Sequence, residues 1–255
     1  MAAYFVLSTG RCGTQWLTET IQQWDESFVV EHEPLHFGYR PDLNTVRQPL
    51  LHNREMLENH LRQIRQHLHT GKQYIETGFP CWRHLSWFKQ QLGHTVKVIH
   101  IHRAPLDTVA SLLKLNAFVP PLLPHLPIKN LYLPSDEQDC LHRYRDLWPQ
   151  LNPAEKNLWY WAEVQAQALH YQQQWSTHDW LTLNFSQLFS AQGKQQLSRF
   201  LGCPDTVCWP AQDKVDQFGL GLVQTPTDFP NLSDINEINQ LAKRFAYPAP
   251  FANSN

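Results

Sequence analysis

The chain lacks the features that mark several large classes of protein. It has only five cysteines in 255 residues, an odd number without the spacing of a disulfide framework. A disulfide-stapled secreted domain is therefore disfavoured, and a reducing cytoplasm is expected. No apolar run is long enough to span a bilayer and no signal-peptide pattern opens the chain, so we expect no membrane insertion. The net charge of −2 supplies no basic excess, which argues against a nucleic-acid partner.

The length and composition of the chain suit one domain of the size of a typical enzyme. Hydrophobic residues make up 42% of the sequence and aromatic residues 12%. This is enough for the core of an α/β protein, and we predict a single domain over residues 1–255. Residues 117–135 are rich in proline and show no helical periodicity. A long connection of this kind favours a lid or an acceptor-binding insertion, which we place around residues 116–150.

The most informative segment is residues 4–17. An apolar run is followed by a turn bracketed by Gly10 and Gly13, and then by apolar residues at helical spacing. This pattern predicts a strand, a loop and a helix. The N–H groups of the loop and of the helix N-terminus favour a bound phosphate or a similar anion. Arg11 adds a cation to the loop, and Thr14 places a hydroxyl at the start of the helix.

The same loop departs from the P-loop of ATP-binding enzymes. A P-loop has four residues between its glycines and a Lys after the second, whereas here two residues separate Gly10 from Gly13 and no Lys follows. A magnesium-dependent ATPase or kinase is therefore disfavoured. Taken alone, the segment also fits an ordinary strand–turn–helix connection.

A second segment has the same organisation. Residues 94–103 are typical of a buried strand that ends at Arg103, and residues 104–113 of the helix that follows, with Ser111 near its end. In an open α/β sheet, ligands bind beyond the carboxyl ends of the strands. Two such junctions, each with an arginine and a hydroxyl, could hold two phosphate groups of one ligand.

Together these segments resemble the two nucleotide-binding signatures of the sulfotransferases, which use 3′-phosphoadenosine 5′-phosphosulfate (PAPS) and release adenosine 3′,5′-bisphosphate (PAP). The resemblance implies that the first loop holds the phosphosulfate through Arg11, Cys12, Gly13, Thr14, Gln15 and Trp16, with Trp16 on the adenine. It implies that Arg103 and Ser111 bind the 3′-phosphate. A weaker match at residues 180–188 adds Phe185 to the nucleotide site. The resemblance covers roughly residues 4 to 202.

The fold that this resemblance implies is a three-layer α/β/α arrangement with a central parallel sheet, similar to the P-loop NTPases. Cys12 and Gln15 stand where hydroxyl residues are usual, and Gly78 stands where cytosolic members carry their catalytic histidine. The Arg-Lys-Gly motif of those members is not visible near the C-terminus. Trp16 has a second interpretation, which is packing in the core beside Leu17.

Because Gly78 cannot act as the base, another residue is needed. The best candidate is Glu33, since Glu33-Pro34-Leu35 resembles the Glu-Pro-Leu of carbohydrate sulfotransferases, whose base is a carboxylate. Glu33 also fits a loop carboxylate or a helix cap. The runners-up for the base are His32, Glu31, His36 and Glu76. We predict Arg11 as the cation for the leaving oxygen.

The predicted activity is therefore transfer of a sulfonate group from PAPS to the hydroxyl of a carbohydrate or another small alcohol or phenol. The alternatives are a P-loop-like nucleotide kinase or phosphotransferase and a non-catalytic nucleotide-binding relative. His100 and His102 alternate along one strand, but no third ligand stands at suitable spacing, so no metal is expected.

Apolar periodicity predicts the remaining elements. Helices are expected at residues 53–69, 83–92, 152–175 and 235–245, and short strands at 28–30 and 74–76. Beyond residue 203 the pattern is irregular until the last of these helices.

Overall fold

The computed structural model describes residues 1–24, 26–35, 54–78, 81–120, 134, 139–203, 209–210, 229, 232 and 235–250. The chain divides into two compact units. The first, called here the sheet unit, comprises Met1–Tyr39, Asn53–His102 and His170–Asp216. The second, the helical unit, comprises Arg40–His52, Arg103–Leu169 and Gln217–Asn255. The single domain over residues 1–255 stays a prediction.

The sheet unit is built on five parallel strands in the order β2-β3-β1-β4-β5. Their bounds are β1 Ala3–Leu7, β2 Phe28–His32, β3 Gln73–Thr77, β4 Val96–His102 and β5 Trp180–Asn184. All five residues of β1 are buried, as expected of a central strand covered on both faces of a parallel sheet. The structure thus confirms the predicted parallel sheet.

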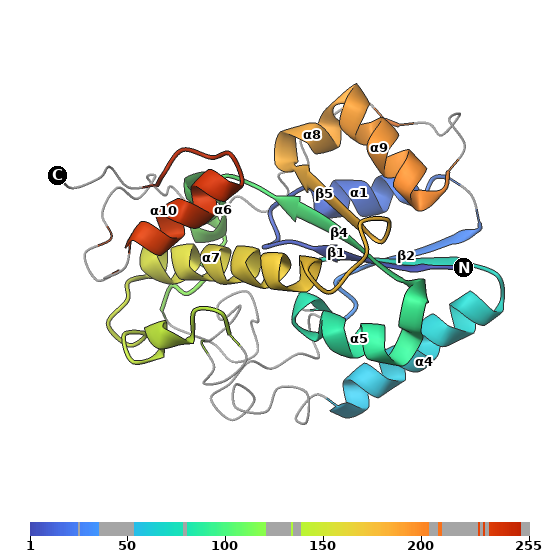
Figure 1. Cartoon of the computed structure of the whole chain (residues 1–255), viewed down its shortest axis with the longest axis horizontal. Helices are drawn as coiled ribbons and strands as arrows, with labels where there is room; N and C mark the ends of the chain where they lie inside the picture. Colours follow the sequence, from blue (N-terminus) through green and yellow to red (C-terminus); the bar gives the residue numbers. More distant parts are fainter. Residues whose placement is uncertain are drawn as a thin grey trace. The chain divides into compact units, whose positions relative to one another are not determined.

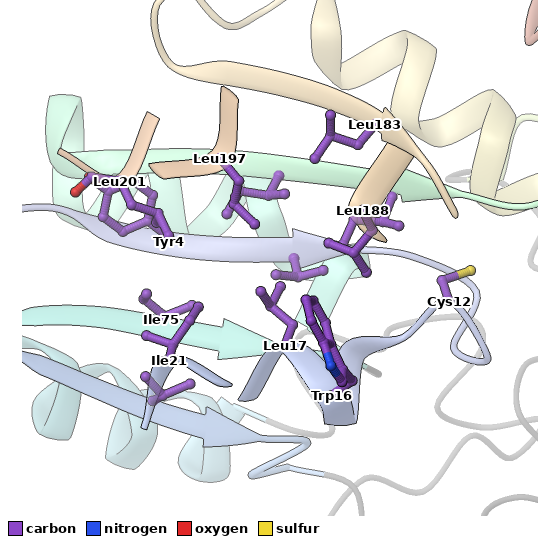
Figure 2. Close-up of a cluster of buried hydrophobic side chains, with 14 of the residues drawn as sticks. Tyr4, Cys12, Trp16, Leu17, Ile21, Ile75, Leu183, Leu188, Leu197 and Leu201 are labelled. Carbon is purple, nitrogen blue, oxygen red and sulfur yellow. The ribbon is translucent and has the colours of Figure 1, made fainter. Parts of the chain in front are cut away.

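Helices cover both faces of this sheet (Figure 1). Tyr4 and Phe5 are adjacent in β1, so their side chains point to opposite faces. Tyr4 belongs to a buried cluster with residues of α1 (Thr14–Ile21) and α9 (Ala191–Leu201), drawn in Figure 2. The ring of Phe5 lies 4.9 Å from that of Phe88 in α5 (Leu85–Leu92). The predicted three-layer arrangement is therefore confirmed for this unit.

The chain order brings three strand ends together at one edge. β1 lies between β3 and β4, and the connection from β3 to β4 passes over it through η1 (Cys81–His84), α5 and η2 (Gly93–Thr95). The strand pairings align Val6 with Thr77, and Thr77 with His32. Because all strands are parallel, the segments after β1, β2 and β3 leave the sheet at the same edge, where ligands bind in such folds.

Two helices follow β5 that the sequence pattern did not predict. α8 (Phe185–Phe189) begins at Asn184, whose side chain accepts from the Gln187 N–H while the Gln187 side chain accepts from the Asn184 N–H. This reciprocal pair is a capping box. Ser190 then caps α9, which ends at Gly202 in the left-handed conformation. Both starts rest on side-chain caps, which apolar periodicity does not detect.

The helical unit contains α6 (Pro105–Lys114), η4 (His142–Arg145), α10 (Ile235–Arg244) and residues 153–169 of α7 (Pro153–Gln172). The buried carboxyl group of Glu163 accepts from the N–H groups of Cys140 and Leu141, at 3.0 and 2.8 Å. Burial, followed by the charge of Asp139, raises the pKa of Glu163 to about 8. None of the described helices combines the length and apolarity that a bilayer crossing requires.

A buried histidine should make the fold sensitive to acid. Burial, reinforced by the charge of Arg83, lowers the pKa of His84 to about 3. An ordinary imidazole has a pKa near 6.5. Between about pH 3 and pH 6.5, His84 therefore binds a proton in the unfolded chain but not in the folded chain. Stability contributed by neutral His84 is therefore present above about pH 6.5 and is lost as the pH falls towards 3, by at most ~1.4 kcal/mol per pH unit.

Urea unfolding of the wild type and of His84→Gln between pH 7 and pH 4.5 tests this expectation. The difference between the two proteins cancels other titrating groups, such as Glu163. The wild type should lose stability relative to His84→Gln as the pH falls, and the exposed His94→Gln control should follow the wild type. A constant difference across the range would contradict the prediction.

Candidate active site

The loop after β1 has an unusual backbone. Gly10, Arg11 and Gly13 have φ values of +73°, +57° and +79°. Residues other than glycine rarely adopt this left-handed region. The Gly10 N–H donates to the Ser8 hydroxyl at 3.1 Å. Among the described residues no side chain caps the start of α1, because its N-cap is Gly13. The loop therefore turns into an uncapped helix N-terminus, which favours an anion.

Gly13 is also where the loop packs against α8. A Cβ atom on Gly13 would lie 2.9 Å from Leu188 Cδ2, 3.2 Å from Phe189 Cζ and 3.5 Å from Phe185 Cε2. The lack of a side chain thus permits this close approach. It brings Phe185 beside the β1–α1 loop, so two predicted nucleotide-contacting segments far apart in the sequence meet in the sheet unit.

The predicted loop residues differ in how far they are exposed. Cys12 and Thr14 are buried, and the Cys12 sulfur lies 3.5 Å from the Thr9 hydroxyl. Gln15 donates to the Glu19 carboxylate at 3.1 Å on the surface of α1. Cys12 lies in the loop after β1 in Figure 2 and belongs to the apolar cluster. Its burial agrees with a small residue accommodated in the loop.

Trp16 packs in the apolar cluster. Its side chain is 6% exposed, and its ring lies 4.9 Å from that of Phe189 and stacks on Trp209 at 5.9 Å. Lys194 Nζ lies 5.7 Å from the centre of the same ring. These contacts agree with the core-packing interpretation of Trp16, and its contact with adenine stays a prediction.

Glu33 lies at the same sheet edge in a constrained position. Its φ is +48°, and its N–H donates to the Thr77 carbonyl at 2.9 Å. A Cβ atom on Gly78 would lie 2.6 Å from Glu33 Cγ and 3.0 Å from Oε1. The Glu33 carboxylate therefore occupies the space that a side chain at position 78 would need. Its Oε1 is 3.9 Å from His32 Nε2, with side-chain exposures of 25% and 32%.

The other candidate bases at this edge point elsewhere. Glu31 accepts from the Tyr74 hydroxyl at 2.7 Å. Glu76 is 1% exposed and contacts His60 Nε2 at 2.5 Å and the Tyr74 hydroxyl at 3.1 Å. Burial lowers the pKa of His60, but its hydrogen bond and attraction to Glu76 outweigh this and raise the pKa overall. His36 lies outside the described residues.

These contacts place Glu31 and Glu76 on one face of the sheet and His32 on the other. Glu31 and Glu76 lie with Tyr74 on the face covered by α4 (Arg54–His69) and α5. His32 and Thr77 lie on the opposite face, with Thr18 of α1. Glu31 and Glu76 are thus held in a polar cluster under α4, away from the loop of Arg11.

Arg103 directly follows β4 and belongs to the helical unit, as does Ser111 in α6. The Arg103 carbonyl accepts from Trp161 Nε1 at 2.9 Å. At the end of β4, burial lowers the pKa of His102 to about 4, and its ring lies 5.4 Å from that of His100. Within the described part of the chain, no group of three or more His, Cys, Asp or Glu side chains is arranged to hold a metal.

Comparisons with known proteins bear on this arrangement. No protein-family model and no curated protein matches the chain. Among solved structures, it is similar to the sulfotransferase domain from the curacin biosynthetic pathway. The TM-score is 0.60 at 14% identity, over 98% of this chain and 99% of that one. The sulfotransferase domain from the Synechococcus PCC 7002 olefin synthase gives 0.54 at 14% identity, over 96% and 94%. The chain has the sulfotransferase fold.

The sulfotransferase fold agrees with the family resemblance that the two signature segments carry. At 14% identity the similarity establishes the architecture, and the reaction has to be argued from the site. Sequence reasoning selected the loop residues and Glu33 as candidates, and these roles stay predictions; it did not select Thr77 and Thr18, which the structure places in hydrogen-bonding contact with each other and, through Thr77, with His32. The available signal was the position of Thr77, which directly follows the predicted strand at residues 74–76 and precedes Gly78.

Proposed function

We propose that this protein transfers a sulfonate group from PAPS to the hydroxyl group of a small acceptor. The observation that carries the proposal is the similarity of fold to sulfotransferase domains over nearly the whole chain. The β1–α1 loop supports it, because a left-handed turn into an uncapped helix N-terminus suits an anionic group. We place the reaction in the cytoplasm, with neither a nucleic-acid partner nor a metal.

In the proposed reaction, different residues bind the donor, stabilise the leaving oxygen and take the proton from the acceptor. The loop N–H groups and Arg11 hold the phosphosulfate, and Arg11 stabilises negative charge on the oxygen that leaves with PAP. Glu33 takes the proton from the acceptor hydroxyl as that oxygen bonds to sulfur. The sulfur–oxygen bond to the nucleotide breaks in the same in-line displacement, similar in logic to phosphoryl transfer. Cys12, Thr14, Gln15, Trp16 and Phe185 complete the proposed nucleotide contacts of the sheet unit.

A thermal-shift comparison separates this function from a kinase. PAP without magnesium should raise the melting temperature, whereas Mg-ATP should have a smaller effect, because the loop lacks the lysine that contacts ATP phosphates. A preference for Mg-ATP would overturn the proposal. A screen with radiolabelled donor sulfate then tests turnover, with oligosaccharides, phenols and lipid alcohols as separate acceptor classes. Stabilisation by PAP without turnover on any class would favour a non-catalytic relative.

Arg103 provides a test of the nucleotide assignment. We propose that Arg103 and Ser111 bind the 3′-phosphate, so Arg103→Ala should weaken PAP binding by about 10- to 150-fold. This corresponds to the ~1.5–3 kcal/mol of a lost charge-assisted contact. Adenosine 5′-phosphosulfate lacks the 3′-phosphate and should bind both proteins equally in calorimetry. Arg54→Ala, which removes an exposed arginine paired with Glu58, is the control. Equal losses for both nucleotides would refute the assignment.

A further inference from the structure

A chain of buried hydroxyl groups connects helix α1 to His32. Thr18 Oγ1 lies 2.9 Å from the Thr14 carbonyl oxygen and 2.6 Å from Thr77 Oγ1. Thr77 Oγ1 in turn lies 2.9 Å from His32 Nδ1. Thr18 and Thr77 are 5% and 0% exposed, so water does not supply alternative partners for their hydroxyl groups. The positions of the protons in this chain are therefore constrained by the protein itself.

Only one placement of protons gives each of these three short contacts a donor. A carbonyl oxygen can only accept, so the Thr18 proton goes to the Thr14 carbonyl. The contact between the two hydroxyls then needs the Thr77 proton, which leaves Thr77 as the acceptor from His32. His32 must accordingly carry its proton on Nδ1. The remaining neighbour of the Thr77 hydroxyl, the Glu31 carbonyl, is farther away at 3.4 Å.

We infer that Thr18 and Thr77 are positioning residues that fix neutral His32 as the Nδ1–H tautomer, leaving Nε2 as a proton acceptor that faces Glu33. The distance from Nε2 to Glu33 Oε1 is 3.9 Å, which a small side-chain movement or one water can close. Which imidazole nitrogen carries the proton is set in proteins by the hydrogen bond of the other nitrogen.

This arrangement gives the proton that leaves the hydroxyl group of the sulfonate acceptor a route out of the site. The role rests on the proposed function. Glu33 takes the proton as the acceptor O–H bond breaks, and the carboxyl O–H bond then breaks as an N–H bond forms at His32 Nε2. The products of this step are a carboxylate and an imidazolium, and the imidazolium returns its proton to water because about a third of its side chain is exposed. If neutral His32 carried its own proton on Nε2, that nitrogen could not accept the proton from Glu33.

The tautomer can be read directly, without substrate. In protein with ¹⁵N-labelled histidine, long-range ¹H–¹⁵N correlation spectra at about pH 8.5 distinguish the two neutral forms. The His32 signals are those missing from His32→Gln. The wild type should show the Nδ1–H form. Thr18→Val frees the Thr77 proton to donate to Nδ1 and should shift His32 towards Nε2–H, although residue 18 does not touch the ring.

Thr20→Val is the matched control, since it makes the same change in the same helix to a buried hydroxyl that has no hydrogen-bond partner among the described residues. It should leave the His32 spectrum unchanged. An Nε2–H form in the wild type, or an Nδ1–H form retained in Thr18→Val, would overturn the inference. Because the spectrum needs no nucleotide, either result is independent of whether PAPS is the donor.

Kinetics test the role of the tautomer. Thr77→Val should lower kcat by at least ~10-fold at an unchanged KM for the donor, because a misplaced imidazole proton is costly even when geometry is kept. Thr77→Ser retains the hydroxyl and should restore both the rate and the Nδ1–H spectrum. A Thr77→Val protein with a shifted tautomer and a normal kcat would show that His32 does not move the proton.

Discussion

Glu33→Gln should lower kcat by a factor of about 10²–10⁴ and leave PAP affinity unchanged. The amide keeps the size and hydrogen-bonding reach of the carboxylate but cannot take a proton from the acceptor. The measurement is initial-rate kinetics with radiolabelled donor, together with calorimetry of PAP. Glu58→Gln removes an exposed carboxylate on α4 and should leave both quantities unaltered.

The size of this loss should depend on the acceptor. A phenol with a pKa near 10 ionises more readily than a sugar alcohol and needs less help from a base. We therefore expect the smaller decrease with phenols. Near-normal rates of Glu33→Gln on all acceptors would place the base elsewhere, with His32 as the first residue to examine because its Nε2 faces the same space.

Gly78→Ala should reduce kcat by about 10²-fold, the scale of loss that follows when a reacting group is misplaced by about 1 Å. The new methyl group would lie 2.6 Å from Glu33 Cγ, so the carboxylate has to move. PAP binding should persist, since the β1–α1 loop is not altered. Kinetics and calorimetry on the same preparation separate the two effects.

Gly71→Ala is a closely matched comparison. Both glycines have positive φ, +104° at Gly78 and +82° at Gly71, but a Cβ atom on Gly71 meets nothing within 4 Å. Each substitution should cost about 1–2 kcal/mol of stability from backbone strain. Only Gly78→Ala should also lose activity. Equal kcat values for the two variants would mean that the position of the Glu33 carboxylate does not matter to the reaction.

The sheet and most helices follow from the sequence because apolar spacing determines them. Helix α4 begins within one residue of its prediction, and β4 lies inside the predicted strand. The predicted helix at residues 83–92 begins as the 3₁₀ turn η1, and α5 itself starts at Leu85. The Pro-rich stretch expected to form a lid lies largely outside the described residues.

The site was predicted less completely, for a physical reason. Local spacing shows that Glu31, His32 and Glu33 are consecutive, but it does not show what each side chain meets. The position of Glu33 beside Gly78 depends on the pairing of β2 with β3, a contact between residues 45 positions apart in the sequence. The packing of Trp16 against Trp209 is likewise a long-range contact. Neither appears in the periodicity of one segment.

The contacts of β2 have a consequence for the integrity of the sheet. β2 is an edge strand of the described sheet, and edge strands are prone to slip or to pair with another chain. Two polar contacts fasten it to β3 from opposite faces, Glu31 to Tyr74 and His32 to Thr77. A shift by one residue would exchange the faces of all side chains and break both contacts at once. His32, which we propose carries the proton away from Glu33, therefore also helps to hold the register of this edge strand of the described sheet, and a fixed register disfavours aggregation.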